Sequence, residues 1–243
     1  MDLSTAEHLL ELNRRFYADF GPQFSATRLR IQPGVRKILT QLEGTERILD
    51  LGCGNGELAR ALTQSGFHGT YTGLDFSPPL LRDANLQHGD FPAHFQAADL
   101  TTPDWDGFLG SSRFSLVTAF AVLHHIPSVE LRRAILQKVH RLLEPAGRFI
   151  HSNWQFLNSE TLRQRIQPWE QAGISSADVD TDDHLLDWRG GGSGLRYVHH
   201  FSPQELSQLA QETGFQVKDT FFSDGEGGKL GLYQVWEGYE NQG

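Results

Sequence analysis

The chain has 243 residues, in which 21 Lys and Arg stand against 30 Asp and Glu, so its formal net charge is −9 at pH 7. A hydrophobic fraction of 38% and a charged fraction of 21% are typical of a globular domain and exclude disorder over most of the chain, and the single cysteine excludes a disulfide framework or a cysteine-rich zinc site. No apolar run reaches the roughly 18 residues that a membrane span requires, and the net acidity argues against a protein that coats DNA.

The N-terminal stretch, residues 4–43, carries apolar side chains at helical spacing. Two runs recur at i, i+3 and i+7: Leu9, Leu12 and Phe16, followed by Val35, Ile38 and Leu42. We therefore expect two or more helices that form a cap over residues 1–44. The first 16 residues are charged and amphipathic and lack the apolar run of a signal peptide, which predicts a cytoplasmic protein.

Strands and helices alternate through residues 45–154, the expected cofactor-binding core. The apolar runs predict strands at 47–51, 70–74, 94–98, 114–121 and 147–153, with helices at 58–65, from Ser77 onward, and at 129–143. Alternation of this kind indicates βαβ units, and hence a parallel sheet with helices on both faces.

The alternation stops over residues 155–200, which we interpret as an insertion on the substrate side. It returns in residues 201–243 with a helix over 202–213, which opens on the capping box Ser202-Pro203-Gln204-Glu205, and with strands at 215–222 and 231–236. Because no helix separates these two strands, we expect an antiparallel hairpin at the sheet edge. The prediction is one α/β domain over residues 1–243, with a doubly wound, mostly parallel, seven-stranded sheet of Rossmann-like type and an antiparallel last strand.

A glycine-rich loop follows the first core strand: Asp50-Leu51-Gly52-Cys53-Gly54-Asn55-Gly56. Glycines at this place let backbone N–H groups approach a ligand, and the following helix contributes partial positive charge at its N-terminus. Asp75 ends the next strand, where a carboxylate can hold the hydroxyl groups of a ribose.

Two cofactors fit such a loop, and the charged residues favour one of them. A dinucleotide site has a third glycine at the position that Glu57 occupies here, and Asp50 would repel a pyrophosphate. S-adenosylmethionine has an ammonium group and a ribose but no phosphate, so it suits this loop. Asp99, at the end of the third strand, is placed to accept from the adenine amine. The predicted cofactor-binding residues, with no metal site expected, are Tyr17, Asp50, Gly52, Gly54, Gly56, Asp75, Phe76, Asp99, Leu100 and Phe120.

Residues 45–155 and 201–237 resemble class I S-adenosylmethionine-dependent methyltransferases. Three further segments resemble the tRNA methyltransferases that esterify the carboxymethyl group on the wobble uridine: Phe16 to Arg28, Leu123-His124-His125-Ile126-Pro127, and Leu195 to Phe201. The sequence departs from that family at Val198, where the family has Tyr, and in its overall acidity. The resemblance implies a tRNA acceptor and a small activating partner protein, with Tyr17 closing over the cofactor.

The catalytic candidates are Arg28, His124, Arg196 and His199. A carboxylate acceptor is already ionised near neutral pH and needs only to be positioned, which the guanidinium groups of Arg28 and Arg196 can do. A hydroxyl or amine acceptor would instead need a base, which His124 or His199 could supply.

Other functions stay open beside the tRNA enzyme. One is a small-molecule O- or N-methyltransferase of the same fold, and another is a module that binds S-adenosylmethionine without catalysis. An NAD-linked oxidoreductase is disfavoured by Asp50 and Glu57.

Charge is unevenly distributed along the chain. Residues 24–47 hold five cations against Glu43 and Glu46, whereas residues 174–188 hold five acids and no Lys or Arg, and residues 219–240 hold five acids against Lys229. Any RNA footprint is therefore small or is completed by a partner.

Overall fold

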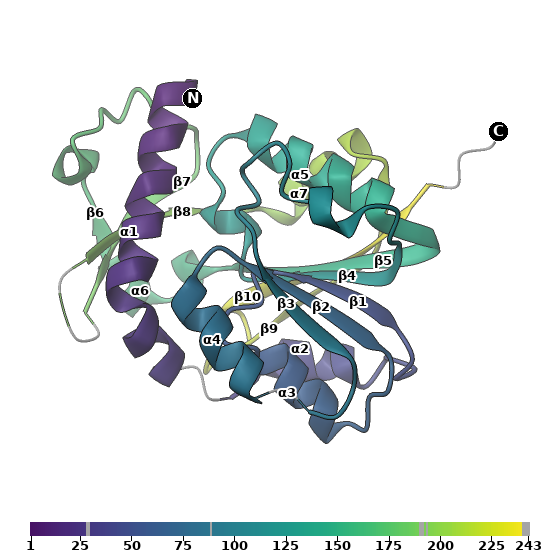
Figure 1. Ribbon diagram of the computed structural model, residues 1–243. Coiled ribbons are helices and arrows are strands. Elements are labelled where there is room, and N and C mark those ends of the chain that lie inside the picture. Colours follow the sequence, from purple (N-terminus) through teal and green to yellow (C-terminus); the bar gives the residue numbers. More distant parts are fainter. Residues whose placement is uncertain (28–29, 88, 190–191, 193, 240–243) are drawn as a thin grey trace.

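The main sheet of the computed structural model has seven strands in the order β3-β2-β1-β4-β5-β10-β9 (Figure 1). The structure describes residues 1–27, 30–87, 89–189, 192 and 194–239. The strands are β1 (Arg47–Leu51), β2 (Thr70–Asp75), β3 (Ala93–Ala97), β4 (Phe114–Phe120), β5 (Leu143–Trp154), β9 (Phe215–Ser223) and β10 (Gly231–Gly238). Strands β1 to β5 pair in parallel, and β10 pairs antiparallel with both β5 and β9. The predicted α/β sheet with an antiparallel last strand is confirmed.

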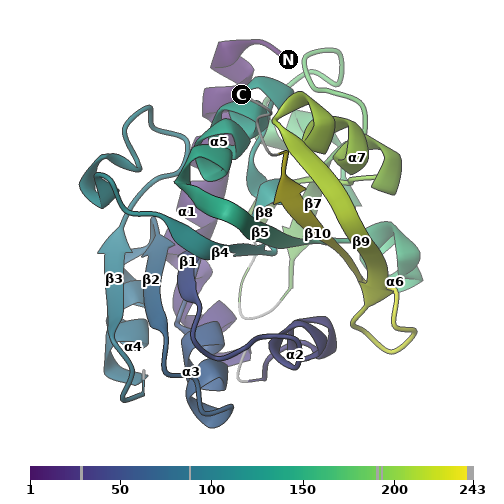
Figure 2. The same ribbon diagram turned by 90° about the vertical axis from the view of Figure 1, so that its right-hand side faces the viewer.

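Helices cover both faces of this sheet (Figure 1). One face is covered by α2 (Pro33–Leu39), α3 (Glu57–Gln64) and α4 (Pro78–Gln87), and the other by α5 (Val129–Leu142) and α7 (Pro203–Glu212). Each face has its own apolar core because the strands of a parallel sheet are buried on both sides. Figure 2 shows the β9–β10 hairpin closing the edge of the sheet.

Most core elements begin and end close to their predicted positions, because Gly and capping residues mark the ends of the helices. Gly66 follows α3 with a φ of 76°, the left-handed conformation in which glycine commonly ends a helix. Ser202 caps α7 by accepting a hydrogen bond from the Glu205 N–H. Strand β5 is longer than predicted, because the chain leaves α5 at Leu142 and enters the strand at once.

A second sheet, with strands in the order β6-β7-β8, lies within the insertion. Its antiparallel strands are β6 (Ile166–Gln167), β7 (Asp183–Trp188) and β8 (Gly194–His199), and short helices accompany it at α6 (Glu160–Arg163), η3 (Phe156–Asn158) and η4 (Trp169–Ala172). Two further 3-10 turns, η1 (Gly107–Leu109) and η2 (Leu123–His125), flank β4.

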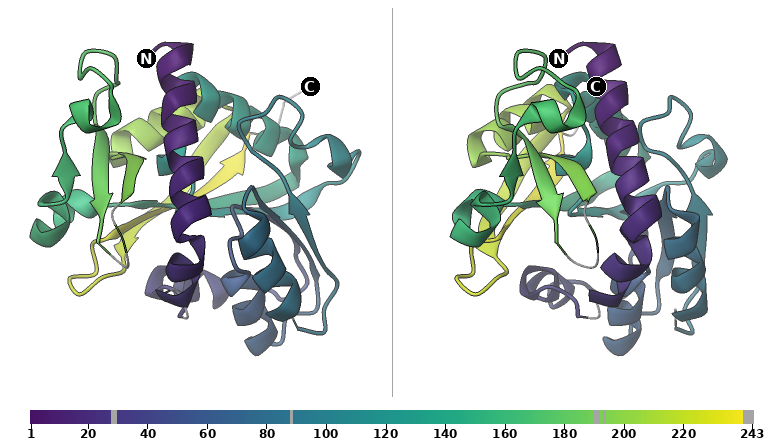
Figure 3. Two further views of the ribbon diagram at one scale, coloured as in Figure 1. Left: turned by 60° about the vertical axis from the view of Figure 1, so that its left-hand side comes forward. Right: turned by 90° about the vertical axis from the view of Figure 1, so that its left-hand side faces the viewer.

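Helix α1 (Leu3–Thr27) packs along β8 and also contacts α4, so it lies between the small sheet and the main sheet (Figure 3). Among the helices of the described residues, none has the length and apolar character needed to cross a membrane.

Candidate active site

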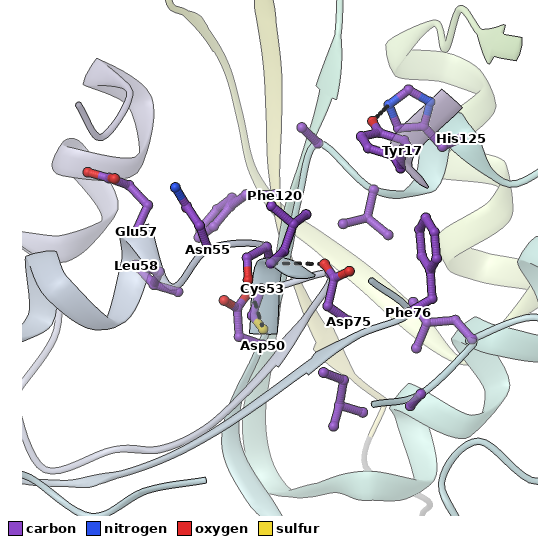
Figure 4. A pocket seen from close by; sticks show the side chains of 18 of the residues that line it. Tyr17, Asp50, Cys53, Asn55, Glu57, Leu58, Asp75, Phe76, Phe120 and His125 are labelled. Atoms are coloured by element: carbon purple, nitrogen blue, oxygen red, sulfur yellow. Dashed lines mark hydrogen bonds between the residues drawn. The ribbon is translucent and has the colours of Figure 1, made fainter. Parts of the chain in front are cut away.

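A pocket opens at the carboxyl ends of β1, β2, β3 and β4, and α1 forms one of its walls (Figure 4). Ligands bind at this edge in doubly wound sheets, because loops from successive strands converge there. Nine of the ten predicted cofactor-binding residues line the pocket: Tyr17, Asp50, Gly52, Gly54, Asp75, Phe76, Asp99, Leu100 and Phe120.

The glycines of the loop serve different contacts. Gly52 and Gly54 have φ values of 69° and 55°, in the left-handed region that favours glycine. A Cβ on Gly52 would lie 2.5 Å from the Val122 side chain, whereas a Cβ on Gly54 would point into open space. Gly54 therefore leaves room for a ligand at the loop.

Gly56, the tenth predicted residue, is not among the residues lining the pocket. It precedes α3 with a φ of 78°, and a Cβ there would lie 3.0 Å from both Cα and Cβ of Ala84 in α4. In this structure Gly56 lets α3 and α4 approach each other.

Asp50 and Asp75 are buried carboxylates at the base of the pocket. Asp50 accepts hydrogen bonds from the Tyr71 hydroxyl at 2.6 Å and the Thr118 hydroxyl at 2.7 Å. Burial raises the pKa of Asp50 to about 6, although these hydrogen bonds oppose the shift.

Asp75 is held by the backbone of the loops beside it. It accepts from the N–H of Gly54 at 2.9 Å and of Ser77 at 2.8 Å, and burial raises its pKa to about 6 as well. Buried carboxylates whose charge is costly are stabilised by a cation, which suits an ammonium- and sulfonium-bearing ligand and disfavours a pyrophosphate. The donor set thus fits S-adenosylmethionine.

Asp99 lies in a different environment from Asp50 and Asp75. Its Oδ1 accepts from the Thr101 N–H at 3.0 Å and the Thr101 hydroxyl at 2.6 Å, and its Oδ2 accepts from Arg14 Nη2 at 2.7 Å. Although burial raises the pKa of Asp99, the hydrogen bonds from Thr101 and Arg14 outweigh it and lower the pKa below the usual value. This carboxylate therefore stays ionised at the mouth of the pocket.

Aromatic side chains line the opposite wall (Figure 4). The Tyr17 ring stands edge-on to the rings of Phe76 and His125, with centroids 5.8 Å and 5.7 Å away. The Tyr17 hydroxyl lies 3.0 Å from His125 Nε2, and His125 Nδ1 lies 3.2 Å from the Tyr197 carbonyl oxygen. Because a carbonyl only accepts, Nδ1 carries the proton that it donates to Tyr197, and the Tyr17 hydroxyl is the partner of Nε2.

The two adjacent histidines of η2 are placed differently. His125 lines the pocket, whereas His124 is buried outside the pocket lining, and its Nδ1 accepts from the Trp154 N–H at 3.3 Å. The role predicted for His124 stays a prediction, and the structure places its neighbour His125, rather than His124, in the pocket lining.

Arg196 is buried in β8 among aromatic rings. Its guanidinium carbon lies 4.6 Å from the ring centre of Trp154, 5.4 Å from that of Phe16 and 5.8 Å from that of Trp188. Arg196 is not among the residues lining the pocket. It contacts Phe16, whose ring stacks edge-on against Tyr17, and Tyr17 lines the pocket. Arg28 lies outside the described residues.

His199 lies in a buried ion network away from the pocket lining. Its Nδ1 lies 2.7 Å from Asp183 Oδ1 and its Nε2 lies 2.8 Å from Glu205 Oε1. Burial lowers the pKa of His199, but the two carboxylates outweigh it and raise the pKa above the usual value. Tyr197, two residues earlier in the same strand, shares this side of it, and its hydroxyl donates to Asp183 at 2.7 Å.

Sequence reasoning missed the contribution of α1 beyond Tyr17. Leu10, Asn13 and Arg14 also line the pocket. Together with Tyr17 these positions are spaced i, i+3, i+4 and i+7, so the helical repeat itself was a usable signal. The predicted repeat followed the adjacent apolar face, of which Leu9 and Phe16 are buried.

Comparisons with known proteins identify the family. The family described as Methyltransferase domain matches residues 24–220. A protein of Encephalitozoon cuniculi described as a candidate methyltransferase is 28% identical over 206 residues, which cover 84% of this chain and 87% of that one. The tRNA (carboxymethyluridine(34)-5-O)-methyltransferase of Arabidopsis thaliana is 29% identical over 192 residues, which cover 79% of this chain and 42% of the plant protein, so the chain spans less than half of that relative.

Solved structures share the fold. The crystal structure of an S-adenosylmethionine-dependent methyltransferase from Methanosarcina mazei aligns with a TM-score of 0.64 at 20% identity, over 86% of this chain and 99% of that one. The family match covers most of the chain, and the pocket has the glycine loop and the carboxylates that such a cofactor requires. The chain therefore belongs to the Methyltransferase domain family and is an S-adenosylmethionine-dependent methyltransferase.

Proposed function

We propose that this methyltransferase esterifies a carboxylate, namely the carboxymethyl group on a wobble uridine of tRNA. The observation that carries the proposal is Arg196, whose buried guanidinium lies among aromatic rings one side chain behind the pocket wall. A guanidinium in such surroundings is well suited to a carboxylate, because its planar fork matches the two oxygens and little water competes. The likeness to the Arabidopsis tRNA enzyme supports the same acceptor.

The chemistry asks the protein for alignment rather than proton removal. The bound cofactor supplies a methyl group on a cationic sulfur, and a carboxylate oxygen forms the new O–C bond as the C–S bond breaks and its electron pair stays on sulfur. Asp50 and Asp75 would hold the cofactor end, and α1 contributes one wall of the pocket. Placing both reactants in line in a dry site accounts for much of the rate enhancement in such transfers.

His125 and Tyr17 contribute a neutral polar wall to this site. Nε2 of His125 is engaged by the Tyr17 hydroxyl, and its Nδ1 donates to the Tyr197 carbonyl. A carboxylate acceptor needs no base, so this pair has the task of orienting the acceptor rather than deprotonating it.

The basic N-terminal cap is where we infer that RNA approaches. Arg30 lines the pocket and is exposed, and Arg36 and Lys37 on α2 are exposed nearby in sequence. Because the chain is acidic overall, this footprint is small, and we propose that a small partner protein in the cytoplasm completes it.

The test is methyl transfer to tRNA with labelled cofactor. We expect label on tRNA that bears 5-carboxymethyluridine, and not on tRNA with unmodified uridine, and the label should be released as methanol in mild base because it is an ester. Arg196→Ala should lower transfer by about 100-fold, since a misplaced acceptor costs rates of this order, while affinity for S-adenosylhomocysteine stays within about twofold.

The matched control is Arg189→Ala, since Arg189 is exposed and paired with Asp187. It should leave transfer unchanged. Arg196→Lys keeps the charge and loses the fork, so it should transfer poorly and remain folded. Transfer to small hydroxyl or amine acceptors, with base-stable products and no labelled tRNA even when a partner protein is supplied, would refute the proposal.

A further inference from the structure

One face of α1 forms the roof of the cofactor pocket. Leu10, Asn13, Arg14 and Tyr17 line the pocket and follow one another at helical spacing. Asn13 donates to the carbonyls of His125 and Tyr197, each at 3.2 Å, and accepts from the Tyr197 N–H at 2.8 Å. These contacts fasten α1 to η2 and β8, on the acceptor side of the pocket.

Arg14 fastens the same helix to the other side, at the end of β3. Its Nη2 and Nε donate to Asp99 Oδ2 at 2.7 Å and 3.2 Å, and Nη2 also lies 3.4 Å from the Thr101 hydroxyl. Thr101 holds Oδ1 of the same carboxylate through two hydrogen bonds. Both oxygens of Asp99 are therefore held, which fixes the plane of the carboxylate at the pocket.

The ion pair between Arg14 and Asp99 is partly exposed. The side chains of Arg14 and Asp99 are 41% and 27% exposed. Half-exposed ion pairs contribute little to folding, so this one can break and re-form without unfolding the domain. It nevertheless joins the roof of the pocket directly to a predicted cofactor ligand.

We propose that Arg14 is a positioning residue that links α1 to cofactor binding: it orients the Asp99 carboxylate for the adenine amine and, through the same contact, holds α1 beside the bound cofactor. The proposal goes beyond the choice of methyl acceptor and rests on the assignment of Asp99 to adenine. Arg14 remains on Asp99 when the cofactor is bound.

The experiment measures S-adenosylhomocysteine binding by calorimetry in five proteins: wild type, Arg14→Ala, Arg15→Ala, Asp99→Asn and the Arg14→Ala/Asp99→Asn double variant. Arg15 is the matched control, because it is the next residue of α1, is exposed, and pairs with Glu11. We expect Arg14→Ala to weaken binding by about five- to tenfold, a usual effect of losing a charged hydrogen bond, and Arg15→Ala to stay within about twofold. If Arg14 acts through Asp99, the double variant should bind no more weakly than Asp99→Asn alone.

Hydrogen exchange gives a second readout that a merely stabilising surface pair would not change. S-adenosylhomocysteine should slow amide exchange over residues 3–20 in wild type and in Arg15→Ala, and the slowing should be lost in Arg14→Ala. Equal affinities for the two single arginine variants, or additive losses in the double variant, would overturn the proposal. Tighter binding by Arg14→Ala would also overturn it, since Arg14 would then compete with adenine, as would an unchanged affinity in Asp99→Asn.

Discussion

Asp50 and Asp75 make the affinity for a cationic cofactor depend on pH. Burial raises the pKa of each to about 6, so both carboxylates of the ligand-free protein take up protons as the pH falls through 6. A protonated Asp50 no longer attracts an ammonium group, and a protonated Asp75 accepts a hydrogen bond from a ribose hydroxyl less strongly, so the cofactor binds tightly only after each proton is released. We expect affinity for S-adenosylhomocysteine, measured by calorimetry, to fall by about tenfold per carboxylate between pH 7 and pH 5.

The sign for folding is opposite, which separates weaker binding from unfolding. A raised pKa stabilises the protonated folded state, so the contribution of these two groups to the free energy of unfolding increases as the pH falls from 7 toward 4. Asp50→Asn should reduce the pH dependence of the affinity by the part that one carboxylate contributes. Asp99, whose pKa is lowered, is the control, because Asp99→Asn should leave the change of affinity between pH 7 and pH 5 as it is in wild type. An affinity that is constant from pH 5 to pH 7 in wild type would contradict the assignment.

At the scale of elements, two glycines of the same loop have different tasks: Gly54 leaves room for a ligand, and Gly56 lets α3 and α4 approach each other. Gly56→Ala adds a Cβ that meets Ala84 of α4, at a position whose φ is positive. It should therefore lower the free energy of unfolding in urea by about 2–4 kcal/mol. Gly54→Ala is the matched variant, since its φ is also positive but its Cβ enters open space. Gly54→Ala should lower the free energy of unfolding by about 1 kcal/mol and should weaken cofactor binding. The folded Gly56→Ala protein should bind the cofactor as wild type does. Equal stability losses in the two variants would show that backbone strain, and not the α3–α4 contact, determines the cost.

The elements that could be predicted from sequence are those whose pattern is local. The strand ends that carry Asp50, Asp75 and Asp99 follow from apolar runs that stop at an acid beside a glycine loop. The partner of Asp99 did not follow, because Arg14 lies 85 residues away and reaches it only once α1 has packed. The backbone geometry of the turn η2 decides which of the two adjacent histidines faces the pocket, and two identical neighbouring residues give no sign of that geometry in the sequence.

The small sheet was beyond sequence patterns for a related reason. β6 has two residues, too few for a repeat, and it reaches its partner β7 only across residues 168–182. Strands β7 and β8 are close in the chain and pair with each other. The charges in this region also changed meaning. Asp183, one of the five acids counted in residues 174–188, is buried and pairs with Arg132 and His199.

For the molecule as a whole, this buried network joins the small sheet to the main domain. Asp183 of β7 and His199 and Tyr197 of β8 meet Arg132 of α5 and Glu205 of α7. Arg132 also donates to the Ile126 carbonyl just beyond η2. Changes in the network are therefore expected to move the wall of the active site as well as the stability of the fold.

The charge of His199 determines how strongly the network stabilises the protein. Its folded pKa is raised above the usual value of about 6.5, so its contribution is fully present below about pH 6.5 and is lost as the pH rises through the folded pKa. His199→Gln removes one of the two cations that Asp183 and Glu205 share, and leaves Arg132 as the other. We expect it to lower the free energy of unfolding in urea by about 3 kcal/mol at pH 6, the order found when one partner of a buried ion pair is removed, and by less at pH 9. His94→Gln, on the exposed surface of β3, should show no gap at either pH. A gap between wild type and His199→Gln that stays constant from pH 6 to pH 9 would contradict this prediction, because the stabilisation would then not depend on the charge of His199.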